Sequence, residues 1–214
     1  MRLLDLFCGA GGASKGYADA GFEVVGVDIK KQRHYPFEFH QADALEWLTE
    51  NEHEQFDFIH ASPPCQRWSK GARRHGTQDN HPDLIEPTRA LLDSTGLPYV
   101  IENVSGAPLT NTVMLCGTMF DLGVFRHRMF ETNWELPQPE HHRHTGRIGD
   151  GKYVTVTGHS GGSSSRDGWT NGGSDLWIEA MGIDWMTTRE MSQSIPPAYT
   201  RFIADVFLNT ISVE

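Results

Sequence analysis

Four short apolar runs, separated by stretches with helical patterning, constrain the fold of this chain more than any other feature. They span residues 3–7, 23–27, 56–61 and 99–101, and their lengths are typical of buried strands. Strands that alternate with helices favour a parallel sheet, because each crossover returns the chain to the same edge. The sequence therefore predicts an α/β fold with a doubly wound, mostly parallel sheet.

The helices between these strands are predicted from their caps and breakers. The first is expected to begin at Ser14, whose hydroxyl would cap it, and to end near Ala20. A second begins at the acidic Asp43. A third covers 83–92, and Pro87 is expected to weaken its middle.

The amino-acid composition of the chain changes after residue 135. Residues 136–174 are rich in His, Gly, Ser and Thr, and we interpret them as a small irregular insertion rather than a second core. Residues 175–214 return to helical patterning and complete the core formed by 1–135. The last predicted helix starts at Pro196–Pro197 and has five apolar residues on one face, namely Tyr199, Phe202, Ile203, Val206 and Phe207.

Composition limits the classes of protein to consider. No run of about 18 apolar residues occurs, which argues against a membrane span, and the N-terminus lacks a signal-peptide pattern. Three cysteines, an odd number, favour reduced thiols in a cytoplasm over a disulfide framework. The net charge of -10 argues against tight non-specific binding to nucleic acid, although basic residues gather locally at 67–74.

A glycine-rich turn lies between the first two predicted elements. Gly9, Gly11 and Gly12 follow the first strand, and Asp28 ends the second. Glycines permit tight turns and close approach of a ligand, and a carboxylate at this strand end accepts hydrogen bonds from ribose hydroxyls. Because the spacing departs from G-x-G-x-x-G, a mononucleoside such as S-adenosylmethionine is favoured over a dinucleotide. An ordinary glycine-rich turn is the alternative.

The third strand ends in a stiff turn that contains a cysteine. Cys65 follows Pro63 and Pro64, and the prolines end the strand and hold the loop rigidly at its carboxyl end. Ligands of open α/β sheets bind at this edge, so this position suits a nucleophile. Arg67 is among the cations that would lower the pKa of the Cys65 thiol. A small buried residue is the alternative, and Cys8 and Cys116 fit that description better.

Two further polar groups accompany the last predicted strands. Glu102 and Asn103 end the strand at 99–101, where a buried carboxyl is either paired or has a raised pKa that makes it a proton donor. Arg126 and Arg128 are two residues apart and are predicted to point to one side of a strand. Arginine binds carbonyl or phosphate oxygens. A salt-bridged strand end, or a solvated edge, is the alternative.

Five motifs in this order resemble the cytosine-C5 DNA methyltransferase family. They are Asp5-Leu6-Phe7-Cys8-Gly9-Ala10-Gly11-Gly12, Pro64-Cys65-Gln66, Glu102-Asn103-Val104, Arg126-His127-Arg128 and Ser194-Ile195-Pro196-Pro197. The resemblance covers residues 1 to about 135 and about 180 to 207. It implies a Rossmann-like class I methyltransferase fold, with the insertion as a reduced target-recognition region.

The resemblance also implies the site and its chemistry. Catalysis would use Cys65, Glu102, Asn103, Arg126 and Arg128. S-adenosylmethionine would be held by Phe7, Cys8, Gly9, Ala10, Gly11, Gly12, Asp28, Ile29, Asp43, Pro64, Gln193 and Ser194. The thiolate would attack C6 of a cytosine flipped out of double-stranded DNA, and C5 would then take the methyl group.

Two departures from the family pattern bear on substrate and partners. Ser192-Gln193 stand where the family has Gly-Asn, which would reshape the cofactor pocket. The recognition region is short, so weak specificity or a helper subunit would follow for a chain expected to be a monomer. A compact enzyme of this kind suits the cytoplasm of a bacterial or phage-infected cell. RNA or a free cytosine nucleotide as substrate, or an idle DNA-binding paralogue, are the alternatives.

A run of histidines raises the question of a metal. His141, His142 and His144 are close in sequence, but Cys116 is remote and no cysteine pair is present. The usual zinc spacings are therefore absent. The sequence predicts no metal, and the histidines are interpreted as part of a polar loop that approaches phosphate.

Overall fold

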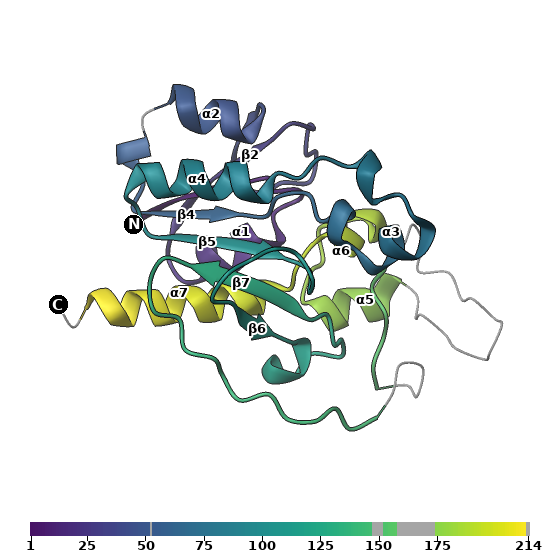
Figure 1. The fold of residues 1–214 in the computed structure, drawn as a ribbon. Helices are drawn as coiled ribbons and strands as arrows, with labels where there is room; N and C mark the ends of the chain where they lie inside the picture. The colour runs from purple at the N-terminus through teal and green to yellow at the C-terminus, as the bar shows by residue number, and fades with distance from the viewer. Residues whose placement is uncertain (52, 147–151, 158–173, 213–214) are drawn as a thin grey trace.

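A seven-stranded sheet organises the molecule in the computed structural model, which describes residues 1–51, 53–146, 152–157 and 174–212 (Figure 1). The strand order is β3-β2-β1-β4-β5-β7-β6. The strands are β1 (Arg2–Leu6), β2 (Glu23–Asp28), β3 (Glu38–Gln41), β4 (Phe58–Ala61), β5 (Tyr99–Asn103), β6 (Val113–Leu115) and β7 (Arg128–Thr132).

The topology creates a ligand edge. Strands β3, β2, β1, β4 and β5 are mutually parallel, and β7 runs antiparallel to both β5 and β6. From β1 the chain winds first to β2 and β3, and then returns to the opposite side through β4 and β5. The order therefore reverses beside β1, and ligands of open α/β sheets bind outside the carboxyl ends of the strands at such a point. The predicted fold class is confirmed.

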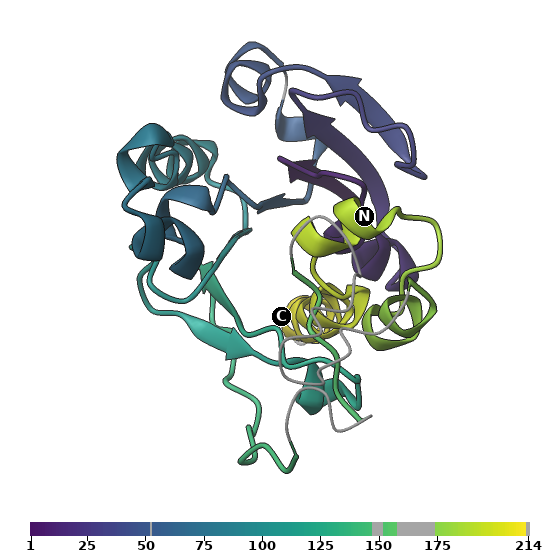
Figure 2. The same ribbon diagram turned by 90° about the vertical axis from the view of Figure 1, so that its right-hand side faces the viewer.

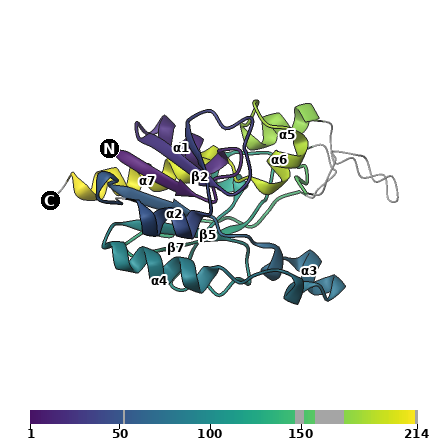
Figure 3. The same cartoon turned by 90° about the horizontal axis from the view of Figure 1, so that it is seen from above.

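Helices cover both faces of the sheet. Figure 1 shows α2 and α4 on one side of the strands and α7 on the other, and Figure 3 shows α1 beside α7, against which it packs. The helices are α1 (Gly12–Asp19), α2 (Ala44–Glu50), α3 (Lys70–His75), α4 (Ile85–Thr95), α5 (Ser174–Met181), α6 (Thr188–Gln193) and α7 (Pro197–Ile211). Short 3-10 turns are η1 (His53–Gln55), η2 (Gln66–Trp68), η3 (Gln78–Asn80) and η4 (Gly117–Phe120).

Alternation along the strands builds two cores, because successive side chains of a strand point to opposite faces. Leu3 and Phe58 pack with Tyr199 and Phe207 of α7, whereas Leu4 packs with α2 and α4 on the other face. A third apolar cluster, around Trp177 and Met181 of α5, lies at the carboxyl edge. Figure 2 looks onto this edge, with α3 on one side and α5 and α6 on the other.

Two helix starts differ from the sequence prediction. Helix α1 begins at Gly12, with Gly11 as its N-cap at φ +88°, so Ser14 is not the cap. Its hydroxyl instead donates to the buried carboxylate of Asp5. Pro87 lies in the first turn of α4 rather than in its middle, where a missing N–H costs no helical hydrogen bond.

The predicted insertion is described only in part. Residues 137–146 run without regular structure, and Val154 forms an isolated bridge to Val124. The rest of the segment between 147 and 173, apart from 152–157, lies outside the described residues. Among the described residues, no helix combines the length and apolarity needed to span a membrane.

Candidate active site

The glycine turn lies directly above β1. Phe7 and Gly9 adopt left-handed backbone angles, with φ of +59° and +51°. Such angles are uncommon for a residue with a side chain and cluster at functional sites. A Cβ built on Gly9 meets no atom within 4 Å. The backbone at Gly9 therefore faces open space, as a ligand cradle requires.

The second half of the turn packs against the C-terminal part of the chain. A Cβ at Gly12 would lie 1.8 Å from the hydroxyl oxygen of Ser194 and 2.6 Å from the carbonyl oxygen of Ile195. Trp185 donates its indole N–H to the carbonyl oxygen of Ala10 at 2.9 Å. The two motifs that the sequence analysis assigned to one pocket therefore meet. Gln193, the last residue of α6, is exposed beside them.

Acidic residues follow the neighbouring strands. Asp28 ends β2 and accepts hydrogen bonds from the backbone N–H groups of Gly9 at 3.0 Å and Lys30 at 2.8 Å. The side chain of Ile29 next to it is 63% exposed, which leaves an apolar surface at this corner. Asp43 is the N-cap of α2 and accepts from two backbone N–H groups of its first turn. A carboxylate has lone pairs for further donors.

The cysteine loop is fixed by a hydrogen bond from the next strand. Asn103, at the end of β5 and almost fully buried, donates its side-chain N–H to the carbonyl oxygen of Pro63 at 2.9 Å. Its own side-chain oxygen accepts from the backbone N–H of Val104 at 2.9 Å. Cys65 then precedes the turn η2 and is half-buried, as is Pro64. The loop is thus anchored two residues before the thiol.

The thiol of Cys65 has a raised pKa in the free protein. Burial is the largest cause and the charge of Glu102 adds to it, whereas Arg128 and Arg126 act in the opposite direction. Arg67, the expected partner, instead contacts the carbonyl oxygen of His81 at 3.2 Å and Asp79 at 3.4 Å. The cations that favour the thiolate come from the start of β7. Cys8 is buried, and burial raises its pKa well above the usual range.

Glu102 is paired and still holds its proton more tightly than usual. Its Oε1 lies 3.0 Å from Nε of Arg128, and its side chain is nearly buried. Burial raises the pKa of Glu102, against the opposing effects of Arg128 and of a hydrogen bond from Ser62. The sequence analysis treated a raised pKa and an ion pair as alternatives, but both are present. A carboxyl group with a raised pKa therefore lies one strand away from the cysteine loop.

Arg126 lies outside the strand in which it was predicted to lie. It lies before β7 with φ of +33°, so it does not share a strand face with Arg128. Its guanidinium donates to the carbonyl oxygens of Val156 at 2.7 Å and Ser192 at 2.9 Å. Burial, with Arg128 as a second cause, lowers the pKa of Arg126 to about 9. Its contacts connect the start of β7 to the end of α6.

The sequence profile of the C-5 cytosine-specific DNA methylase family matches residues 1–114 of the 214. The match covers more than half of the chain and contains the glycine turn, Cys65 and Glu102. The chain belongs to this family. The type II methyltransferase M.FnuDI of Fusobacterium nucleatum is 35% identical over 114 residues, which are 50% of this chain and 33% of that protein. The matched part thus spans about a third of the length of this curated relative.

Solved structures agree on the fold over the whole chain. A candidate DNA modification methyltransferase encoded within an E. coli prophage matches with a TM-score of 0.64 and 14% identity, covering 99% of both chains. The DNMT2 of Spodoptera frugiperda matches with a TM-score of 0.63 and 12% identity, covering 97% of this chain and 99% of that one. At these identities the likeness concerns the fold alone.

A row of buried, hydrogen-bonded polar side chains lies beneath the site and was not predicted from the sequence. His60 of β4 contacts the hydroxyl of Tyr17 and the hydroxyl of Ser62, both at 3.0 Å, and Ser62 in turn donates to Glu102. Burial lowers the pKa of His60 to about 3, so this imidazole is neutral. The position of a histidine inside the apolar run 56–61 could have indicated this row, because a fully buried histidine needs hydrogen-bond partners.

Proposed function

We propose that this chain is an S-adenosylmethionine-dependent enzyme that transfers a methyl group to C5 of cytosine in DNA. The observation that carries the proposal is the placement of Cys65 and Glu102 at the same edge of the sheet. Cys65 follows β4 and Glu102 lies near the end of β5. These two strands are adjacent and parallel, and they end at the edge that also holds the glycine turn. The Cys65 loop is held by the hydrogen bond from Asn103 to Pro63. Glu102 is held by Arg128 and Ser62, and the charge of Glu102 acts on the thiol.

The edge above β1 and β2 fits the cofactor. The open space at Gly9 admits a ligand against the backbone, the carboxylate of Asp28 accepts from ribose hydroxyls, and exposed Ile29 offers an apolar surface to the adenine. The remaining cofactor contacts are assigned to Phe7, Cys8, Ala10, Gly11, Gly12, Asp43, Pro64, Gln193 and Ser194. When bound, S-adenosylmethionine supplies an electrophilic methyl group.

The residues of the chain would make C5 of cytosine nucleophilic. The Cys65 thiolate attacks C6 and forms a C–S bond, while protonated Glu102 donates its proton to N3, so that C5 becomes an enamine carbon. After methylation, the C5 proton passes to water, the C6–S bond breaks and releases the thiolate, and N3 returns its proton to Glu102. Arg128 holds the cytosine O2 and Asn103 holds the loop. The base must leave the duplex to reach these groups.

The proton on Glu102 has a second effect in this scheme. The carboxylate charge is one cause of the raised pKa of Cys65, and Arg128 and Arg126 lower that pKa. Protonation of Glu102 removes the opposing charge and leaves both cations acting on the thiol. The acid and the nucleophile therefore titrate as a coupled pair, and the form with neutral Glu102 is the one in which the thiolate is favoured.

Backbone contacts with DNA would come from α3. Arg73, Arg74 and His75 are exposed in its last turn, and α3 follows the Cys65 loop at the same end of the molecule (Figure 1). A local basic surface suits phosphate binding even in a chain with a net charge of -10. Recognition of a target sequence would fall to residues 136–174, with a helper subunit if that short segment is insufficient.

Trapping with 5-fluorocytosine tests the proposal. A duplex containing it should form a covalent adduct with the protein in the presence of S-adenosylmethionine, because no removable proton remains at C5. Peptide mapping should place the adduct on Cys65. A protein that methylates normal DNA yet never forms the adduct would rule out the covalent route.

Parallel reactions separate the substrate classes. Labelled cofactor is incubated with duplex DNA, RNA or dCMP, and transfer to DNA alone is expected. Transfer only to RNA or dCMP would refute DNA as the substrate but would still support methyl transfer to cytosine. Cofactor binding with no transfer to any of the three would indicate an idle paralogue.

A further inference from the structure

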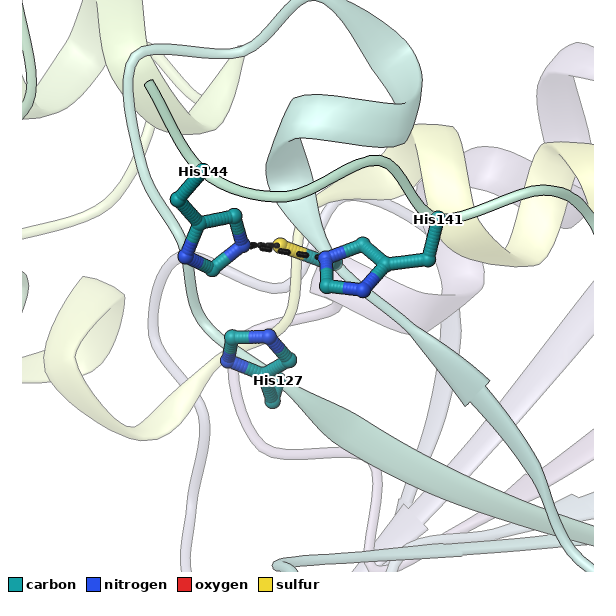
Figure 4. A group of neighbouring side chains, drawn as sticks. His127, His141 and His144 are labelled. Atoms are coloured by element: carbon teal, nitrogen blue, oxygen red, sulfur yellow. Dashed lines mark hydrogen bonds between the residues drawn. The ribbon is translucent and has the colours of Figure 1, made fainter. Parts of the chain in front are cut away.

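Four potential metal ligands converge beside the start of β7. They are Cys116, His127, His141 and His144, and their ligand atoms all lie within 4.8 Å of one another. Figure 4 shows the three imidazole rings turned toward one another. The sequence analysis expected no metal because Cys116 is remote from the histidines. Folding nevertheless brings these four residues together.

Two of the spacings between ligand atoms are close to those around a tetrahedral ion. Bond lengths of about 2.3 Å to sulfur and about 2.0–2.1 Å to nitrogen place ligands about 3.3 Å (N to N) and about 3.5 Å (S to N) apart. Nε2 of His141 and Nε2 of His144 are 3.0 Å apart, and Sγ of Cys116 is 3.3 Å from Nε2 of His144. These two distances lie within a few tenths of an ångström of the ideal values, and all four ligand atoms, including that of His127, lie within 4.8 Å of one another.

The surroundings hold the ligands in place. Cys116 is fully buried, and its sulfur lies 3.2 Å from the hydroxyl of Thr118. The ring of His144 stacks on Phe125 with centroids 4.1 Å apart, and Tyr153 packs on Phe125 at 4.5 Å. A thiolate with three imidazoles suits Zn²⁺, which accepts both ligand types and has no geometric preference of its own. Ligand orientation by neighbouring groups is typical of such sites.

We propose that Cys116, His127, His141 and His144 bind one Zn²⁺ in a closed, structural site. Four protein ligands leave no open position for a substrate, which distinguishes it from a catalytic metal. The ion would join three parts of the chain: the end of β6, the start of β7 and residues 141–144. The first part of the predicted recognition region, residues 136–174, would thereby be attached to the core.

The position of His127 gives the site a role near the chemistry. It lies between Arg126 and Arg128, and its carbonyl oxygen accepts a hydrogen bond from Arg128 at 2.9 Å. Arg128 contacts Glu102. A metal bond to His127 would therefore restrain the backbone that presents Arg128, which makes His127 a positioning residue. The zinc proposal itself does not depend on the proposed methyl transfer, because metal binding is measured without substrate.

Metal content and cobalt spectra of the full chain test the site. Protein expressed in zinc-supplemented medium should contain one Zn²⁺ per chain. Chelated protein titrated with Co²⁺ should show intense tetrahedral d–d bands and a thiolate charge-transfer band. Cys116→Ser should abolish the charge-transfer band, and His141→Ala should weaken Zn²⁺ binding by at least ~10-fold, as expected for a lost ligand. Zinc should also raise the unfolding temperature of the chelated wild-type protein.

His142→Ala is the matched control. The His142 side chain is 81% exposed and pairs with Glu140 at 3.3 Å, although it is adjacent to a proposed ligand in the sequence. This variant should keep wild-type stoichiometry and spectrum. If folded wild-type protein takes up neither ion stoichiometrically, or if His142→Ala loses as much affinity as His141→Ala, the site is refuted. The wild-type titration decides the question even if a ligand variant does not fold.

Discussion

Replacement of Asp5 by asparagine should remove a large pH dependence from the stability of the protein. Asp5 is fully buried in β1; one carboxylate oxygen accepts from Ser14, and the other has no hydrogen-bond partner among the described residues. Burial is the main cause that raises its pKa from 3.8 to about 7, and the charge of Asp28 adds to it. The folded state therefore favours the protonated acid.

The sign and size of the effect follow from linkage. Because the folded pKa lies above the unfolded one, the stabilisation is complete below about pH 4 and is lost as the pH rises to about 7. A tenfold difference in proton affinity between the two states corresponds to about 1.4 kcal/mol, so the loss is on the order of 4 kcal/mol. Asparagine keeps an acceptor for Ser14 and carries no charge, so the variant should be the more stable protein at pH 8.

Urea unfolding of both proteins between pH 4 and pH 8 measures the effect. His60 acts in the opposite direction, because its pKa is lowered to about 3 and its contribution is lost as the pH falls below about 6.5. The difference between the Asp5→Asn and wild-type curves is therefore the quantity to use, and it should rise with pH. Asp205→Asn, at an exposed carboxyl on α7, should follow the wild type. Parallel curves for Asp5→Asn and wild type would refute the reasoning.

Three further predictions concern the site. Cys65→Ala should abolish methyl transfer and leave cofactor affinity in calorimetry nearly unchanged, and residual activity near wild type would contradict its role. Asp28→Ala should weaken cofactor binding by about 1–3 kcal/mol, the cost of unpaired buried polar groups, and an unaltered dissociation constant would exclude the ribose contact. Gly12→Ala should lower the unfolding temperature and cofactor affinity together, because its Cβ would lie 1.8 Å from the Ser194 hydroxyl oxygen; an unaffected protein would show that the turn tolerates movement.

The strands and their polar ends could be predicted because the signals are local. Apolar runs fix β1, β2, β4 and β5, and the residues that follow each run then lie at a common edge by topology alone. This rule places Asp28, Cys65 and Glu102 at one edge from the sequence itself. The meeting of Gly12 with Ser194 was expected only from the family resemblance, and the structure places them in contact.

The parts that could not be predicted depend on contacts between distant segments. Ser14 has the chemistry of a cap, but the buried carboxylate of Asp5 binds its hydroxyl instead. The left-handed backbone of Arg126 removes it from the strand that its spacing suggested. The approach of Cys116 to His127 follows from the pairing of β6 with β7, and no sequence spacing encodes that pairing.

The close fit of α1 against α7 bears on how the protein is made. A Cβ at Gly16 would lie 2.1 Å from the carbonyl oxygen of Pro197, and Thr200 donates its hydroxyl to the carbonyl oxygen of Ala13 at 2.8 Å. Helix α1 leaves the ribosome long before α7 does and must wait for it. During translation, the proposed cofactor site at the glycine turn cannot form completely until residue 200 has been synthesised. A chain that terminates before residue 200 should therefore fail to bind S-adenosylmethionine.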